Sequence, residues 1–175
     1  MPMSARTPAR HERDTVRRRG PAVPRPVVRS LSLSIQLGDG VRELPASRAR
    51  LRRWVAAAID ADATITLRFV DEREARLLNV RYRHRDYATN VLTFSYPGDH
   101  GRVSADVVIC VPVVLREARA QRKAPAAHLA HLVIHGVLHA CGHDHEQPGQ
   151  AARMEAAEVA LLARFRIADP FQVRD

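Results

Sequence analysis

The sequence predicts a single α/β (α+β) domain in which helices cover one mixed sheet of about four strands. Two patterns predict this class: some segments alternate polar and apolar residues, and others repeat apolar residues at helical spacing. The apolar fraction of 46% is enough for a core, and 175 residues fit one domain with little room for a second. Strands and helices intermingle at first, and the chain ends in helices alone.

Four segments are predicted to be strands. Residues 30–37 and 64–70 alternate polar and apolar side chains, which is typical of half-buried strands. Residues 90–94 form a short β-rich run. Residues 106–111 are continuously apolar, so we expect this strand to lie in the centre of the sheet.

Five segments are predicted to be helices. Apolar side chains recur at helical spacing in residues 45–59, in residues 72 to about 83, and in 112–122, 126–141 and 149–165. Asp71 is expected to cap the second helix, because its carboxylate can accept a hydrogen bond from the first turn. Gly142 is expected to end the fourth helix in a left-handed conformation.

The first 29 residues differ from the rest in composition. They contain five prolines and show no apolar periodicity, so we expect residues 1–29 to form a disordered basic arm and residues 30–175 to form the folded domain. The chain carries a net charge of +9, of which residues 1–30 contribute +6. A positive balance favours polyanionic partners such as RNA. A genome bias toward arginine codons is an equally good explanation of the charge.

Cysteine content and hydropathy limit the cellular location. Two cysteines are too few for a disulfide framework, which fits a reducing cytoplasm. No stretch approaches the ~18 consecutive apolar residues that a membrane helix needs. The sequence therefore predicts a cytoplasmic protein that does not span a membrane.

Six of the nine histidines lie between residues 128 and 145, and three of them have the spacing of a metal site. His135 and His139 are four residues apart, so a helix places them on one face within reach of one ion. The bend expected at Gly142 lets His145 supply a third nitrogen. Three neutral nitrogens with an open position are typical of catalytic zinc, whereas structural zinc is held by four protein ligands. We predict that His135, His139 and His145 bind one Zn²⁺.

The neighbouring histidines are expected to have other roles. His131 extends the row, but it is eight residues from His139, or about 12 Å along a straight helix, and too far to share one ion. We expect His131 beside the site and His128 on the surface. Asp144 either orients a ligand imidazole or is an ordinary turn residue.

One position separates this pattern from that of zinc peptidases. Histidines at the first, fifth and eleventh positions, with glycine at the eighth, also occur in metzincin proteases, whose second position is the glutamate that acts as general base. Here that position is Gly136. A zinc peptidase is therefore the least favoured class.

Residues 135–145, HGVLHACGHDH, resemble the H-G-x-L-H-L-x-G-Y-D-H signature of the YbeY-type endoribonucleases, or rRNA maturation factors. His143 replaces the usual tyrosine and Ala140 the usual leucine. The resemblance extends over about residues 31–170. It includes the segment from Leu78 to Phe94, where Ala88 replaces proline and Thr93 replaces serine, then residues 106–110, and finally Met154 and Glu158 of the last helix. Met154 and Glu158 are expected to pack and to support the site.

This resemblance implies a zinc-dependent endoribonuclease that cleaves single-stranded RNA. The family matures the 3′ end of 16S ribosomal RNA and takes part in ribosome quality control, so RNA and the ribosome are the implied partners. The resemblance also singles out Arg83 as catalytic, and a guanidinium there would stabilise charge on a reacting phosphate. A surface ion pair is the alternative role for Arg83. A non-catalytic assembly factor with a structural metal is the alternative function.

Overall fold

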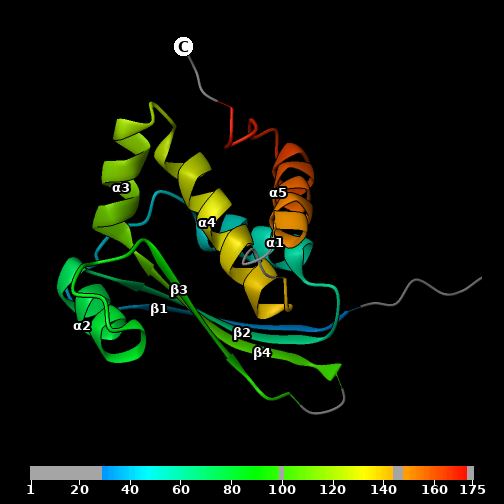
Figure 1. The fold of residues 1–175 in the computed structure, drawn as a ribbon, viewed down its shortest axis with the longest axis horizontal. Helices are drawn as coiled ribbons and strands as arrows, with labels where there is room; N and C mark the ends of the chain where they lie inside the picture. The colour runs from blue at the N-terminus through cyan, green and yellow to red at the C-terminus, as the bar shows by residue number, and fades with distance from the viewer. Residues whose placement is uncertain (1–28, 99–100, 144–147, 173–175) are drawn as a thin grey trace, which may run out of the picture.

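The structure is a computed structural model, and it describes residues 29–98, 101–143 and 148–172. Figure 1 shows a sheet with helices α1, α4 and α5 on one face. The expected arm, residues 1–29, and the expected ligand His145 lie outside the described residues, apart from Arg29. No helix in the described ranges is long and apolar enough to cross a membrane.

The four strands form one mixed sheet, and the predicted fold class is confirmed. The strand order is β1-β2-β4-β3; β2 runs parallel to both of its neighbours, and β3 runs antiparallel to β4. The predicted central strand is interior, because β4 lies between β2 and β3. The strands span β1 Leu31–Leu37, β2 Ala63–Val70, β3 Val91–Tyr96 and β4 Val103–Cys110.

Five helices in the described residues connect and cover the strands, as the periodicity predicted. They are α1 Arg48–Ala58, α2 Glu72–Arg83, α3 Val111–Ala120, α4 Pro125–Ala140 and α5 Pro148–Ala163. Asp71 caps α2 as expected, since its Oδ1 accepts a hydrogen bond from the Glu74 amide at 2.8 Å. Gly142 has a φ of 87°, the left-handed conformation predicted after α4. The first helix begins later than Pro45, because Ser47 is its cap and accepts from the Arg50 amide at 3.3 Å.

The apolar residues form two clusters, one on each face of the sheet. The larger cluster joins α1, α4 and α5 to one face and includes Trp54, Phe69 and Ile134. The smaller cluster lies on the opposite face, where Ala75 of α2 packs against Val108 of β4. This arrangement holds α4 against the sheet along the length that carries the histidines.

Candidate metal centre and cleft

The histidines of α4 form a row along the helix. Ring centroids are 6.2 Å apart for His131 and His135, and 4.6 Å apart for His135 and His139. The two residues predicted to share a metal are therefore the closer pair. Both pairs are four residues apart, so helical spacing accounts for the row but not for the shorter separation of His135 and His139.

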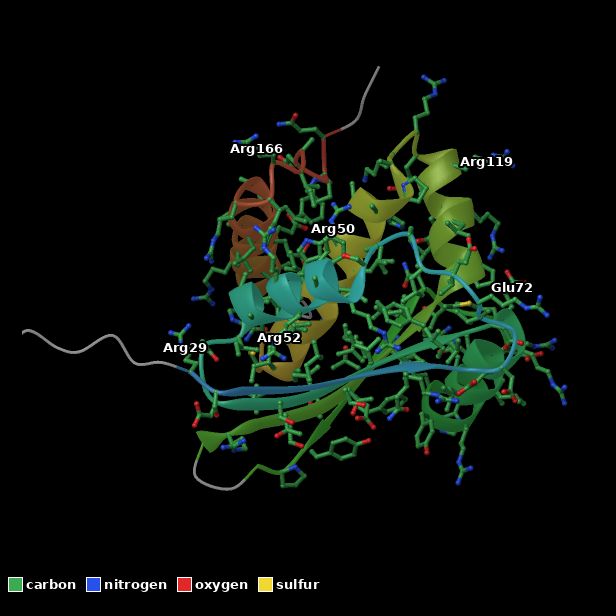
Figure 2. The ribbon with its side chains drawn as sticks, turned by 180° about the vertical axis from the view of Figure 1, so that it is seen from behind. Arg29, Arg50, Arg52, Glu72, Arg119 and Arg166 are labelled. Atoms are coloured by element: carbon green, nitrogen blue, oxygen red, sulfur yellow. The ribbon has the colours of Figure 1, made fainter. Side chains whose placement is uncertain are left out.

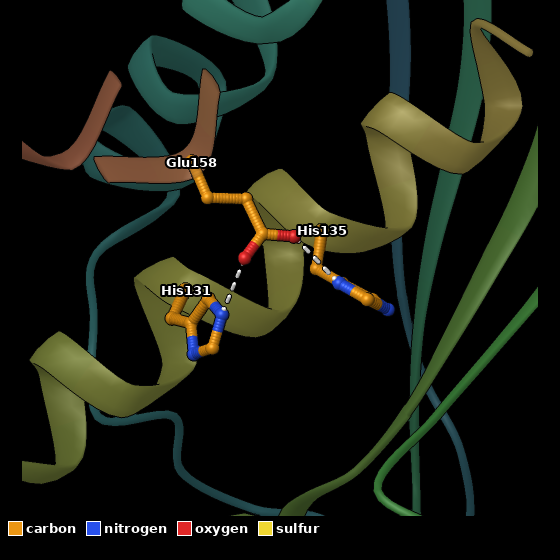
Figure 3. Close-up of side chains that lie close together, drawn as sticks. All are labelled: His131, His135 and Glu158. Carbon is orange, nitrogen blue, oxygen red and sulfur yellow. Dashed lines mark hydrogen bonds and ion pairs between the residues drawn. The ribbon is translucent and has the colours of Figure 1, made fainter. Parts of the chain in front are cut away.

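Glu158 of α5 links His131 and His135. Its Oε2 lies 2.8 Å from Nε2 of His131, and its Oε1 lies 2.7 Å from Nδ1 of His135 (Figure 3). The carboxylate is buried, with 2% of its surface exposed. Burial raises the pKa of Glu158, but the hydrogen bonds from His131 and His135 outweigh it and bring the pKa to about 2. The carboxylate is therefore ionised at neutral pH and accepts from both rings.

The tautomer of His135 follows from this contact. An ionised carboxylate is an acceptor only, so Nδ1 of a neutral His135 carries the proton and Nε2 carries the lone pair. A metal-binding histidine usually donates its other N–H to a carboxylate, which fixes the ring and increases its basicity. The residues present therefore fit a metal ion bound at Nε2 of His135.

A second ligand set is also available. Ligand atoms of His131, His135 and Glu158 lie within 4.8 Å of one another, so these three could hold an ion. In the structure, however, the carboxylate oxygens lie at hydrogen-bond distance from both nitrogens. An ion at this position would have to displace both protons, whereas an ion at Nε2 of His135 keeps both hydrogen bonds.

A cleft of about 630 Å³ brings Arg83 together with His135 and His139. Arg83 is the last residue of α2 and is exposed to solvent. The floor and the remaining walls come from Tyr82 and from residues 89–95, which include most of β3. The edge strand thus lines the cleft, and helices from both faces of the sheet contribute to it.

Gly136 lets α4 approach the sheet closely beside the cleft. A Cβ atom at Gly136 would lie 2.5 Å from Cγ1 of Val107 and 3.2 Å from Oγ1 of Thr93. Thr93 also donates a hydrogen bond to the Gly136 carbonyl at 3.2 Å. A side chain at this position would therefore require Val107 or the helix to shift.

The sequence profile described as Endoribonuclease YbeY matches residues 42–166 of the chain, well over half of its length. The chain belongs to the YbeY endoribonuclease family. Endoribonucleases cleave internal phosphodiester bonds of RNA, so membership places the chain among the nucleases.

Curated YbeY relatives match most of the chain. Endoribonuclease YbeY of Cupriavidus necator is 52% identical over 146 residues, covering 81% of this chain and 73% of the relative. The YbeY proteins of Thiobacillus denitrificans and Bordetella pertussis are each 52% identical, covering 81% of this chain and 96% of the relative. A solution structure of a Thermotoga maritima protein covers 80% of this chain and 99% of its own, with 25% identity and a TM-score of 0.49.

The expectation that His128 lies on the surface was wrong. Only 4% of its surface is exposed, because α4 packs against α3 on this side and Nε2 of His128 lies 2.8 Å from a carboxylate oxygen of Glu117. The amide of Asn90 donates to the same carboxylate at 3.1 Å, and Asn90 lines the cleft. The sequence showed no sign of this network, since its members are far apart in the chain.

Burial of His128 predicts a pH-dependent stability. Burial lowers the pKa of His128, and the hydrogen bond to Glu117 opposes this only in part. Below about pH 6.5 the unfolded chain therefore binds a proton at this histidine more readily than the folded chain does. As the pH decreases, the free energy of unfolding decreases by at most about 1.4 kcal/mol per pH unit. Between pH 7.5 and 5.5, which lie on either side of the ordinary histidine pKa of about 6.5, the melting temperature should decrease less in His128→Gln than in the parent.

Glutamine at position 128 keeps a donor for Glu117, so the substitution changes the titration more than the packing. His84→Asn is the control, because His84 is exposed and its left-handed φ of 56° suits asparagine. Equal pH dependence in the parent and in His128→Gln would contradict the role assigned to burial.

Proposed function

We propose that the chain is a zinc-dependent endoribonuclease of single-stranded RNA that matures the 3′ end of 16S ribosomal RNA and takes part in ribosome quality control. Membership in the YbeY family supports the nuclease class. The observation that carries the proposal is the cleft that joins Arg83 of α2 to His135 and His139 of α4. A cleft of about 630 Å³ lies within the size range of ligand sites and is large enough for a short stretch of an RNA strand.

We assign the metal to His135, His139 and His145. Support comes from the short separation of the first two rings and from Glu158, whose carboxylate holds Nδ1–H of His135. Zn²⁺ bound there would lower the pKa of a coordinated water towards neutrality and draw electron density from a phosphate oxygen. The buried carboxylate keeps the imidazole in the tautomer and orientation that ligation requires.

We assign catalysis to Arg83, which faces the cleft from the end of α2. A guanidinium donates two parallel hydrogen bonds to phosphate oxygens, and its positive charge stabilises the negative charge that builds up during cleavage. Gly136 leaves no room for a general base beside the first histidine. Either an activated water or the RNA 2′-OH is therefore the nucleophile. A terminal 2′,3′-cyclic phosphate on the products would identify the second route.

Cleavage of a labelled single-stranded RNA tests the proposal. His139→Ala should abolish cleavage and zinc binding, and Arg83→Ala should slow cleavage by about 10²- to 10³-fold, the usual cost of one transition-state donor. His84→Asn and Arg85→Ala, which replace exposed neighbours outside the cleft lining, are the controls, and asparagine suits the left-handed φ of 56° at position 84. Full activity of His139→Ala in metal-depleted buffer would overturn the proposal.

The remaining assignments follow from the same activity. We propose that residues 30–175 form the endoribonuclease domain and that residues 1–29 are a basic arm outside it. The family profile begins at residue 42 and so lies wholly within the proposed domain. Ribosomal RNA as substrate places the protein in the cytoplasm, in contact with the ribosome or its precursors.

A further inference from the structure

Helix α1 carries an unusual concentration of positive charge. It contains four arginines and no acidic residue in eleven positions, and its first turn holds no acid. All four arginines are exposed. The start of a helix carries a partial positive charge from its unpaired N–H groups, so basic side chains there are electrostatically unfavourable. This arrangement produces a strong local positive potential.

Carboxylates do not neutralise this charge within the part of the chain that the structure describes. Exposed arginines elsewhere form ion pairs, for example Arg76 with Asp86 at 2.7 Å and Arg116 with Glu72. The α1 arginines form none with the described residues. They contact backbone carbonyls and aromatic rings, which hold a guanidinium in place without cancelling its charge.

Two of the four arginines have a structural explanation. Arg48 donates to the Ile35 carbonyl at 3.1 Å and Arg52 to the Leu31 carbonyl at 3.4 Å. These carbonyls lie on the outer edge of β1, which is an edge strand, so the two side chains satisfy groups that would otherwise be open to another strand. This explanation does not extend to the other two arginines of the helix.

Arg50 and Arg53 occupy a separate face of α1. The guanidinium of Arg50 lies 5.2 Å from the ring of Trp54, and that of Arg53 lies 5.7 Å from the ring of Phe165. The second contact joins α1 to the turn after α5, where Arg164 and Arg166 flank Phe165. Seen from behind, Arg50, Arg52 and Arg166 lie on the side of the molecule formed by α1 and the end of α5 (Figure 2).

This basic surface is separate from the cleft. Helix α1 packs mainly against α4 and also contacts β1, at one edge of the sheet, whereas the cleft is built on β3 at the other edge. We propose that Arg50 and Arg53, with Arg164 and Arg166, bind the phosphate backbone of RNA that flanks the strand in the cleft. The choice of RNA rests on the proposed function, whereas the attraction of a polyanion rests on charge alone. Guanidinium groups held against rings are preorganised to donate to phosphate oxygens.

An anionic membrane is the less suitable partner. The apolar residues of α1, Leu51, Trp54 and Val55, are buried against the core. A helix that lies on a membrane inserts its apolar face between the lipids, and α1 has no such face available. Binding of an RNA backbone requires only the exposed guanidinium groups of α1.

The experiment compares two variants with the same change in net charge. Arg50→Gln/Arg53→Gln removes two arginines from the basic surface, and Arg73→Gln/Arg119→Gln removes two exposed arginines from α2 and α3. Fluorescence anisotropy in EDTA, which prevents cleavage, would measure binding of an RNA hairpin with a single-stranded tail at several salt concentrations. The first variant should bind more weakly, with a slope of log K against log salt that is shallower by about 2, one for each lost phosphate contact.

The control variant should keep the parental slope, and Arg50→Lys/Arg53→Lys should recover most of it because the charge is restored. Equal slopes for the two glutamine variants would overturn the proposal. Loss of binding to anionic vesicles but not to RNA would assign the surface to a membrane and would also overturn it.

Cleavage of a short oligonucleotide that occupies only the cleft should proceed at the parental rate in the first variant. Failure of the nuclease assignment would instead abolish that cleavage in the parent while leaving hairpin binding intact.

Discussion

Replacement of Glu158 by glutamine is expected to weaken zinc binding by about 10- to 100-fold, the usual effect of removing the carboxylate behind a ligand histidine. The side chain keeps its size and stays buried, so the fold should persist. Glutamine, however, has one acceptor oxygen where the carboxylate has two, and it now donates through its amide. His131 and His135 therefore cannot both donate to it.

The consequence for His135 depends on its tautomer. If the new amide donates to Nδ1 of His135, that nitrogen must hold the lone pair and Nε2 takes the proton, which removes the nitrogen assigned to the metal. If the oxygen faces His135, the neutral amide still accepts more weakly than the carboxylate does, and the ligand becomes less basic. Both arrangements lower the affinity for zinc.

Competition with a chromophoric chelator would measure the dissociation constant in each variant. Glu155→Gln is the matched control, since it makes the same chemical change at an exposed position of the same helix. An unchanged zinc affinity in Glu158→Gln would contradict the assigned role. His139→Ala separates the two possible ligand sets: it should abolish zinc binding if His139 is a ligand, and it should preserve binding if His131, His135 and Glu158 hold the ion.

Local patterns in the sequence were sufficient to predict the elements of the fold. Alternation over residues 30–37 and 64–70 marks β1 and β2 because side chains point to opposite faces of a strand. Asp71 and Gly142 mark helix ends because their effects act within one turn. The reversed direction of β3 was not predictable in the same way, since it depends on pairing with β4, which follows it in the chain.

The candidate site was predictable only where its residues are neighbours in the sequence. His135 and His139 are a turn apart, so helical geometry places both on one face, where their ring centroids lie 4.6 Å apart. Glu158 was expected to pack and to support the site, but its two hydrogen bonds depend on how α5 crosses α4. The burial of His128 depends likewise on the packing of α3, and no local pattern predicted Glu117 as its partner.

Replacement of Gly136 by alanine is expected to destabilise the fold although alanine is the better helix former. The helix itself should gain about 1 kcal/mol from the change. The new Cβ would lie 2.5 Å from Cγ1 of Val107, which is fully buried on an interior strand and cannot move aside. Overpacking of this kind costs about 1–3 kcal/mol, and at so short a distance the upper end applies. We therefore expect a net loss of free energy of unfolding, measured by denaturant titration.

A double mutant identifies the contact responsible. Val107→Ala removes the methyl group that the new Cβ would meet, at the cost of a cavity when it is made alone. In combination the two changes exchange volume across the interface between α4 and β4, so Gly136→Ala/Val107→Ala should lose less stability than the sum of the single variants. Gly149→Ala is the control, because no atom lies within 4 Å of a Cβ at that position of α5. Additive losses in the double mutant would show that Gly136 is required for some other reason.

The same contact connects packing to the metal site. Relief of the clash in Gly136→Ala requires α4 to move away from β3 and β4, and α4 carries both His135 and His139. The hydrogen bond from Thr93 to the Gly136 carbonyl would lengthen with this movement, and so would the distance from Arg83 to the imidazoles across the cleft. The separation of His135 and His139 should be kept, because both rings move with one helix, so zinc affinity should change less than cleavage. Cleavage should fall, since it needs the guanidinium and the ligands at a fixed separation. Recovery of cleavage together with stability in Gly136→Ala/Val107→Ala would show that the distance between α4 and the sheet sets the geometry of the cleft.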